Sequence, residues 1–344
     1  MRAKAVAALL AVAGCLTYAT AQATNDPCAN QKPGQPAQEH GCSNPQVDAK
    51  TRQLVSQVYS AVQNGMAAPA TGDQSDAAAA LSYNFHMSDC ENRWVALSHK
   101  PGDSDYTYGF VYIDPEAGFT LQFGGKFTID AAGNFHAAPD PLDSQKINLK
   151  IRLEEGNGVA ALLPPRAITQ LGLPEKPDWL KSYEDKSDPL IHKANWGSFY
   201  NGMGDSRRAL EYLEPAYKEK PDNHKVVFEL AYAYNALERP ADAIQVAKGE
   251  WIKSPKDELL CREMAFAYLS LKSFKEATEQ YPSCIALCDD SEAGRAEKSE
   301  LAMNLGAAYQ EMGDKQNHDE WLNKAKEWAP KGSAVYKHFH PGEE

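Results

Sequence analysis

A pattern that returns every 34 residues in the C-terminal half of the chain most constrains its fold. Gly204-Asp205 is followed at this spacing by Glu238-Arg239 and then by Lys272-Ser273. In a fourth copy the corresponding pair is Gly313-Asp314, displaced by seven extra residues around positions 292–298. A fixed period of this length is typical of a solenoid built from repeated supersecondary units.

Each copy predicts two helices, because apolar residues recur at helical spacing on both sides of the marked pair. The turn between the helices is expected at the Gly-Asp pair, since glycine tolerates positive φ and aspartate caps a helix start. A proline ends the second helix of three copies, at Pro221, Pro255 and Pro330. Small residues recur where the first helix must approach another closely: Gly197, Ala231, Ala265 and Gly306.

These small, aromatic and proline positions resemble those of the tetratricopeptide repeat family over about residues 190–332. The resemblance implies four helix-turn-helix repeats that form an all-α solenoid. The chain departs from the family pattern where Pro215, Gly249 and Pro282 fall inside the second helices. An interior proline destabilises an unsupported helix by about 3 kcal/mol, so we expect kinks there and a broken helix at Pro282.

The N-terminus predicts an exported protein. Residues 1–23 combine two basic residues, an apolar run and the small-x-small sequence Ala21-Gln22-Ala23, as in a cleavable signal peptide. The alternative is that "VAGC" resembles a lipobox, which would lipidate Cys15 and anchor the chain as a lipoprotein. The expected location is periplasmic or secreted, and no other stretch is long and apolar enough for a transmembrane span.

The region before the repeats predicts an α+β domain at residues 47–172. A polar tether rich in Pro, Gly and Gln precedes it at residues 24–46. Within the domain, an amphipathic helix at residues 47–64 is followed by alternating aromatic and β-branched stretches that predict an antiparallel sheet. A connector at residues 173–189 is expected to dock Trp179 and Leu180 against the first repeat, and residues 333–344 form a tail.

Six cysteines remain after cleavage, an even number that predicts disulfide bonds in an exported chain. Cys261 and Cys284 lie about equally far on either side of the turn in the third repeat, so they face each other in an antiparallel helix pair. Cys28 and Cys42 bracket the polar tether and are a second candidate pair. The alternative is that several cysteines remain buried thiols.

Composition excludes some partners. The chain has 35 basic and 47 acidic residues and a net charge of −12, without a basic stripe, so it is not expected to bind nucleic acid. It lacks the sequence motifs of serine hydrolases, zinc proteases and phosphate-binding loops. We therefore expect no catalytic residue, no cofactor and no metal site.

The resemblance implies that a ligand lies in the concave groove lined by the first helices. The corresponding positions are an aromatic strip with two basic neighbours and an amide: Lys225, Phe228, Tyr232, Asn235, Arg262 and Phe266. Such a surface suits a peptide with apolar anchors. The alternative is that these aromatic side chains pack against the N-terminal domain or the connector.

Our first hypothesis is an exported, non-enzymatic interaction or scaffold protein that binds a partner protein or peptide in this groove. The second is an exported enzyme with its active site in the α+β domain and the repeats as a recruitment arm, which predicts converging polar groups with shifted pKa values in that domain. A third is a structural protein that associates with itself.

Overall fold

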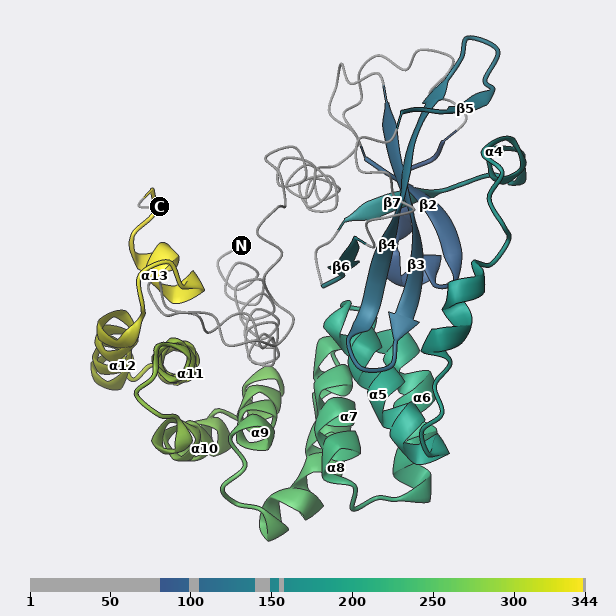
Figure 1. Cartoon of the computed structure of the whole chain (residues 1–344). Helices are drawn as coiled ribbons and strands as arrows, with labels where there is room; N and C mark the ends of the chain where they lie inside the picture. The colour runs from purple at the N-terminus through teal and green to yellow at the C-terminus, as the bar shows by residue number, and fades with distance from the viewer. Residues whose placement is uncertain (1–80, 99–104, 140–148, 155–157, 343–344) are drawn as a thin grey trace, which may run out of the picture. The chain divides into compact units, whose positions relative to one another are not determined.

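The computed structural model describes residues 81–98, 105–139, 149–154 and 158–342. They fall into two compact units that divide between Ser187 and Asp188, a strand-rich unit and a helical unit (Figure 1). The predicted signal peptide, Cys15, the tether with Cys28 and Cys42, and the helix at residues 47–64 lie outside the described residues. In the described parts, no helix has the length and apolar character needed to span a membrane.

The strand-rich unit is an antiparallel sheet in the order β1-β7-β2-β3-β4-β5, with β6 paired to β4. A 3₁₀ segment, η3 (Met87–Cys90), follows β1, and the short helix α4 (Pro165–Gln170) follows β7. The strands are β1 (Phe85–His86), β2 (Arg93–Leu97), β3 (Tyr106–Asp114), β4 (Gly118–Ile129), β5 (Phe135–Ala137), β6 (Lys150–Arg152) and β7 (Val159–Leu162).

The pairing of the two longest strands, β3 and β4, contains a bulge that the Gly124-Gly125 pair makes possible. Their register shifts between Tyr108 and Gly109, so that Tyr108 pairs with Gly125 and Gly109 pairs with Phe123. A Cβ atom on Gly124 would lie 2.6 Å from the ring of Tyr108, and the φ of Gly125 is +138°. Only glycine fits both positions, which explains why the bulge lies at this pair.

One side of the sheet is covered by the connector. Trp179 lies in the 3₁₀ segment η4 (Asp178–Tyr183) and makes edge contacts with Phe110 and Tyr112 of β3. The indole Nε1 of Trp94 donates to the Pro174 carbonyl oxygen at 2.8 Å. Trp179, which the sequence predicts to contact the first repeat, thus packs within its own unit on the apolar surface that the aromatic side chains of β3 provide.

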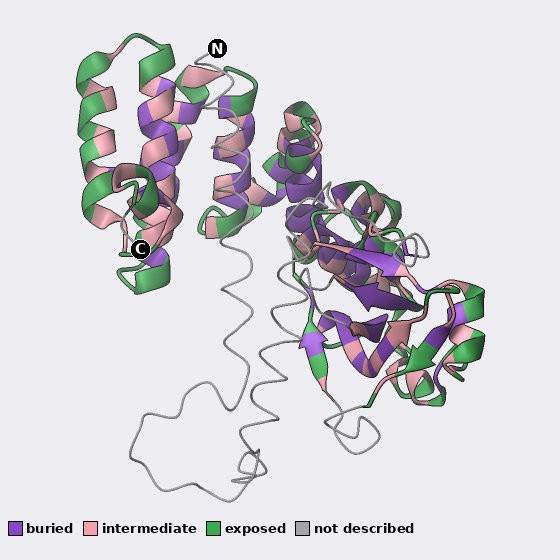
Figure 2. Cartoon of the chain, turned by 90° about the horizontal axis from the view of Figure 1, so that it is seen from above, coloured by how far each residue is buried: buried purple, intermediate pink, exposed green. Residues whose placement is uncertain are grey.

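The helical unit consists of four antiparallel helix pairs and a short final helix, α13 (Ala334–Phe339). Buried residues lie along the sides by which these helices meet (Figure 2). The pairs are α5 (Pro189–Gly202) with α6 (Ser206–Glu219), α7 (His224–Ala236) with α8 (Pro240–Lys253), α9 (Glu258–Ser270) with α10 (Phe274–Leu287), and α11 (Glu292–Glu311) with α12 (Lys315–Trp328).

The turns within the repeats have the chemistry that the sequence predicts. Gly204 and Gly313 have φ values of +73° and +77°, and Asp205 and Asp314 cap the following helices through their side chains. Helix α11 has 20 residues where α9 has 13, so the seven extra residues of the fourth copy lengthen its first helix by about two turns. The predicted fold class, an α+β domain with an antiparallel sheet followed by a helical repeat solenoid, is confirmed.

The prediction of a broken helix at Pro282 is wrong, because α10 runs through Pro282 without interruption. Its neighbours Tyr281 and Cys284 are fully buried, and Cys284 is bonded to Cys261 of α9. These contacts offset the loss of one backbone hydrogen bond at the proline.

Candidate functional site

The first helices of the repeats pack side by side, α5 against α7, α7 against α9 and α9 against α11. They therefore form one continuous face of the repeat array, which is where the groove is expected. The predicted groove residues lie on α7 and α9 of this face: Lys225, Phe228, Tyr232, Asn235, Arg262 and Phe266.

The aromatic members of this set differ in how far they are exposed. Phe228 and Tyr232 are buried, at 5% and 8% exposure, whereas Phe266 is half-buried. Met303 of α11, the first helix of the fourth repeat, is half-buried as well. The accessible apolar surface at these positions is thus on α9 and α11 rather than on α7.

The polar members take part in bonds between neighbouring helices. Lys225 is exposed, and its Nζ donates to the Oδ1 of Asn195 on α5 at 2.8 Å. Asn235 is buried, and its Nδ2 donates to the backbone oxygen and to Oε2 of Glu263 on α9, at 2.9 Å each. Asn235 therefore joins two repeats.

The same bond occurs one repeat earlier. Asn201 of α5 donates to the backbone oxygen and to Oε2 of Glu229 on α7, at 2.9 Å each, and Ser198 Oγ donates to Oε1 at 2.6 Å. All three side chains are at most 2% exposed. A buried carboxylate is costly unless hydrogen bonds satisfy it, so these bonds fix how consecutive first helices stack. The signal was present in the sequence, since Asn201 and Asn235 lie 34 positions apart, as do Glu229 and Glu263.

A denser polar cluster lies where α9, α10 and α11 meet, and we call it the Arg262 cluster. It contains one guanidinium, one thiol and four carboxyl groups: Arg262, Cys288, Glu258, Glu263, Glu297 and Glu300. Ligand atoms of Glu258, Cys288 and Glu297 lie within 4.8 Å of one another. Among the described residues, only this trio is compact enough to offer three such atoms to a metal ion, but Arg262 already contacts Glu297 and we assign it no metal.

The four cysteines that the structure describes are all buried. Cys261 of α9 and Cys284 of α10 form a disulfide bond with a Cα–Cα distance of 5.5 Å, in agreement with the pairing expected from the repeat register. Cys90 and Cys288 are free thiols. Burial raises the pKa of Cys90 to about 12, and burial followed by the nearby Glu258 raises that of Cys288. Both thiols are therefore poor nucleophiles near neutral pH.

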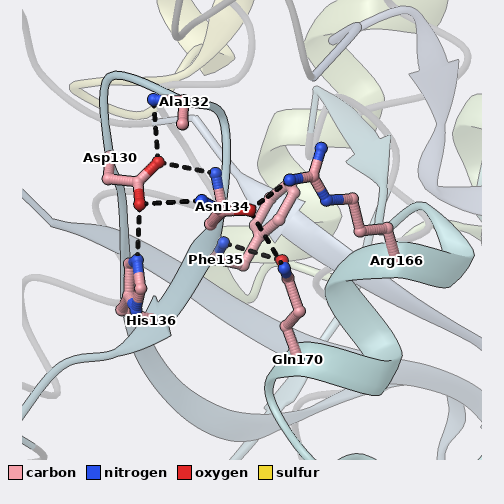
Figure 3. A network of polar contacts seen from close by, with 7 residues as sticks. All are labelled: Asp130, Ala132, Asn134, Phe135, His136, Arg166 and Gln170. Atoms are coloured by element: carbon pink, nitrogen blue, oxygen red, sulfur yellow. Dashed lines mark hydrogen bonds and ion pairs between the residues drawn. The ribbon is translucent and has the colours of Figure 1, made fainter.

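A connected polar network lies at the β4–β5 hairpin of the strand-rich unit (Figure 3). Asp130 accepts hydrogen bonds from the backbone of Ala132 and Asn134, from the Asn134 side chain and, at 2.9 Å, from Nε2 of His136. These bonds, with that to His136 the largest cause, hold the pKa of Asp130 well below its usual range. This is the shifted carboxyl group that the enzyme hypothesis looks for in this domain.

The remaining bonds of the network explain it as a structural feature. Gln170 Oε1 accepts from the backbone nitrogen of Phe135 at 2.9 Å, and the side chains of Arg166 and Gln170 donate to Asn134 Oδ1. The network therefore closes the hairpin turn and attaches α4 to it (Figure 3). Asp130 and His136 are both substantially exposed, at 38% and 57%, and they converge on backbone groups of the turn rather than on an enclosed pocket.

Comparison with known families supports the repeat register. Residues 201–249 and residues 299–331 match models of the tetratricopeptide repeat family. The helical unit thus contains tetratricopeptide repeat segments at these residues, whereas no family model matches the residues of the strand-rich unit. No curated protein matches the chain.

Solved structures with some likeness to the chain include "MamA MSR-1 C2", "MamA 41-end from Desulfovibrio magneticus RS-1" and BtubC (BKLC) from P. vanneervenii. The chain is 19%, 17% and 18% identical to them over 47%, 48% and 47% of its length, which covers 85%, 85% and 70% of theirs. The TM-scores are 0.37, 0.37 and 0.36, values too low to support an argument about function.

Proposed function

We propose that the chain is an exported, non-enzymatic scaffold protein that binds a partner protein or peptide along the face formed by α5, α7, α9 and α11. The tetratricopeptide repeat segment carries this proposal, since such arrays present an extended, preformed surface built from many equivalent positions. Export is supported by the signal-like residues 1–23 and by the Cys261–Cys284 bond, because disulfide bonds persist in oxidising compartments.

The accessible part of this face combines a cation with apolar side chains. Lys225 is exposed on α7, and Phe266 and Met303 are half-buried on α9 and α11. A partner segment with apolar anchors and an acidic group fits this combination, since aromatic and basic residues contribute most to binding at such surfaces. The hydrogen bond of Asn235 on α7 to Glu263 on α9 and the ion pair of Arg262 on α9 with Glu297 on α11 fix how these helices stack, which keeps the surface preformed and lowers the entropic cost of binding.

The test begins with a photo-crosslinking amino acid at position 266 of the full mature chain, applied to the extracytoplasmic fraction of the source cells. The same amino acid at position 252 is the control, because Ile252 is 71% exposed on the second helix α8. A protein crosslinked from position 266 but not from position 252 is then purified and titrated against folded variants.

The decisive comparison uses two matched double variants. Lys225→Glu with Phe266→Ser alters the first-helix face, and Lys248→Glu with Ile252→Ser makes the same kinds of change on exposed residues of α8. We expect the first variant to weaken binding at least about tenfold, or about 1.4 kcal/mol, and the second to leave it unchanged. Equal dissociation constants for the two variants would move the binding surface away from the first helices and refute the proposal.

A further inference from the structure

The Arg262 cluster contains more carboxyl groups than cations, and each of these carboxyl groups is buried or half-buried. Arg262 of α9 lies 3.3 Å from oxygen atoms of both Glu263 and Glu297, and the three side chains are only 11%, 7% and 14% exposed. Glu258 lies one turn before Arg262, beside Glu297 and the Cys288 thiol, and Glu300 lies one turn after Glu297. One guanidinium thus faces four carboxyl groups.

The groups that face this cluster come from all three helices that meet there. Helix α9 contributes Glu258, Arg262 and Glu263, the end of α10 contributes Cys288, and α11 contributes Glu297, Lys298 and Glu300. Lys298 is the second cation, but its Nζ is paired with Asp290. Four ionised carboxylates would therefore leave uncompensated negative charge in a site with little water, which is strongly unfavourable.

Protons are the simplest means of removing this charge. Burial raises the pKa of Glu297 to about 7, with Arg262 opposing the change and Glu258 adding to it. Burial also raises the pKa of Glu300 to about 7, again opposed by Arg262 and increased by Glu297. A group whose pKa is raised on folding favours the folded arrangement below its unfolded value, and this contribution is lost as the pH rises through about 7.

The position of the cluster couples these protons to the arrangement of the repeats. Glu258, Arg262 and Glu263 belong to the third repeat, whereas Glu297 and Glu300 belong to the fourth. Glu297 also lies in the stretch by which α11 exceeds the other first helices, so its contact with Arg262 and Glu258 has no counterpart at the junctions between earlier repeats. At those junctions, the buried Glu229 and Glu263 each accept hydrogen bonds from an asparagine instead.

We propose that the Arg262 cluster is a proton-dependent latch, which holds α11 against α9 and α10 when its surplus carboxyl groups are protonated and loosens this junction when they ionise. The fourth repeat is thus tightly docked in mildly acidic surroundings and more mobile above neutral pH. The proposal concerns the chain itself and is independent of any partner that the repeats bind.

Hydrogen exchange of the full mature chain, analysed by mass spectrometry at about pH 6 and about pH 8.5, tests this latch. After correction for intrinsic exchange rates, we expect the protection of amides in α11 to fall at least about tenfold at the higher pH, since one unit of pKa shift corresponds to a tenfold change. Protection in α7, two repeats away, is expected to stay the same. Unchanged protection in α11 would overturn the proposal.

Two variants separate this effect from general pH sensitivity. Glu297→Gln with Glu300→Gln removes both ionisations, so its α11 protection is expected to be the same at both pH values. Glu311→Gln is the control on the same helix, because Glu311 is exposed, and it should behave like the unmodified chain. A pH-dependent loss of protection in the double variant equal to that in the unmodified chain would also overturn the proposal.

A direct titration covers the case in which the double variant folds poorly. The chain is labelled with carbon-13 in its glutamate carboxyl groups, and single variants Glu297→Gln and Glu300→Gln assign the resonances. We expect at least one of these two resonances to titrate near pH 7. If both titrate below about pH 5, as ordinary glutamates do, the latch does not exist.

Discussion

Two glycines in helix interiors should respond in opposite ways to the same added methyl group. A Cβ atom on Gly197 of α5 would lie 2.4 Å and 2.5 Å from side-chain carbon atoms of Leu213 on α6, and Leu213 is fully buried. Gly249 of α8 is exposed, and, apart from its chain neighbours and the backbone of its own helix, no atom lies within 4 Å of the position that an added methyl group would take there. The helix propensity gained is about 1 kcal/mol at both sites, so the contact with Leu213 decides the difference.

The magnitude follows from these contacts. Overpacking in a buried interface destabilises a protein by about 1–3 kcal/mol. We therefore expect Gly249→Ala to raise the free energy of unfolding by about 1 kcal/mol, and Gly197→Ala to lower it by up to about 2 kcal/mol, since its propensity gain offsets part of the clash. The assay is urea unfolding of both variants and the unmodified chain, followed by the helical circular dichroism signal.

A double-mutant cycle tests the assigned cause. In a Leu213→Ala background the clashing side chain is absent, so Gly197→Ala should then stabilise the chain, as Gly249→Ala does. If Gly197→Ala is as stabilising as Gly249→Ala in the unmodified background, α5 and α6 separate without cost. Close packing of α5 on α6 would then not be the reason for glycine at position 197.

Two further predictions concern the bonds of each unit. Reducing the Cys261–Cys284 disulfide should lower the free energy of unfolding of the repeats by about 3 kcal/mol, because the bond joins positions 23 apart. Urea unfolding with and without reductant measures this, and a Cys261→Ala, Cys284→Ala variant that still responds to reductant would contradict it. In the hairpin, the pKa of Asp130 is lowered on folding. The ionised carboxylate therefore stabilises the folded chain above the ordinary carboxyl pKa of about 4, and this stabilisation is lost as the pH falls below that value. The melting temperatures of the unmodified chain and Asp130→Asn, followed by tryptophan fluorescence, should therefore differ near neutral pH and converge in acid; a constant difference would show that ionisation of Asp130 has no role.

The repeat unit could be predicted from the sequence because its contacts are local. Each helix pair is closed by a turn of three residues, and glycine, aspartate and the tyrosines recur in phase, so one copy predicts the next. The same register predicted that Cys261 faces Cys284, since both lie in one pair of antiparallel helices. It also contained the spacing of Asn201 and Asn235, although this becomes meaningful only when Glu229 and Glu263 are known to be buried beside them.

The sheet and the Arg262 cluster depend on contacts that are distant in sequence. Strand β7 lies between β1 and β2 in the sheet, although it is the last strand in the sequence. The alternation of side chains along a strand does not specify which strands are its neighbours. Trp179 follows the last strand in the sequence and packs against β3, and no sequence pattern around Trp179 indicates this contact. In the cluster, the extension of α11 brings Glu297 to Arg262, which lies 35 positions earlier in the sequence. The 34-residue period does not predict where the inserted residues of α11 lie, so this contact could not be predicted from the repeat.

The disulfide bond lies inside one repeat, and this gives the chain an uneven response to force. In a repeat array, each repeat contacts only the repeats next to it, so a chain pulled from its two ends unfolds one repeat at a time. The third repeat cannot lengthen fully, because the positions from Cys261 to Cys284 remain tied together, which withholds about 80 Å of contour length at about 3.4 Å per residue. The junctions between repeats contain no such bond among the described residues, so the array yields elastically at its interfaces while its third repeat stays closed.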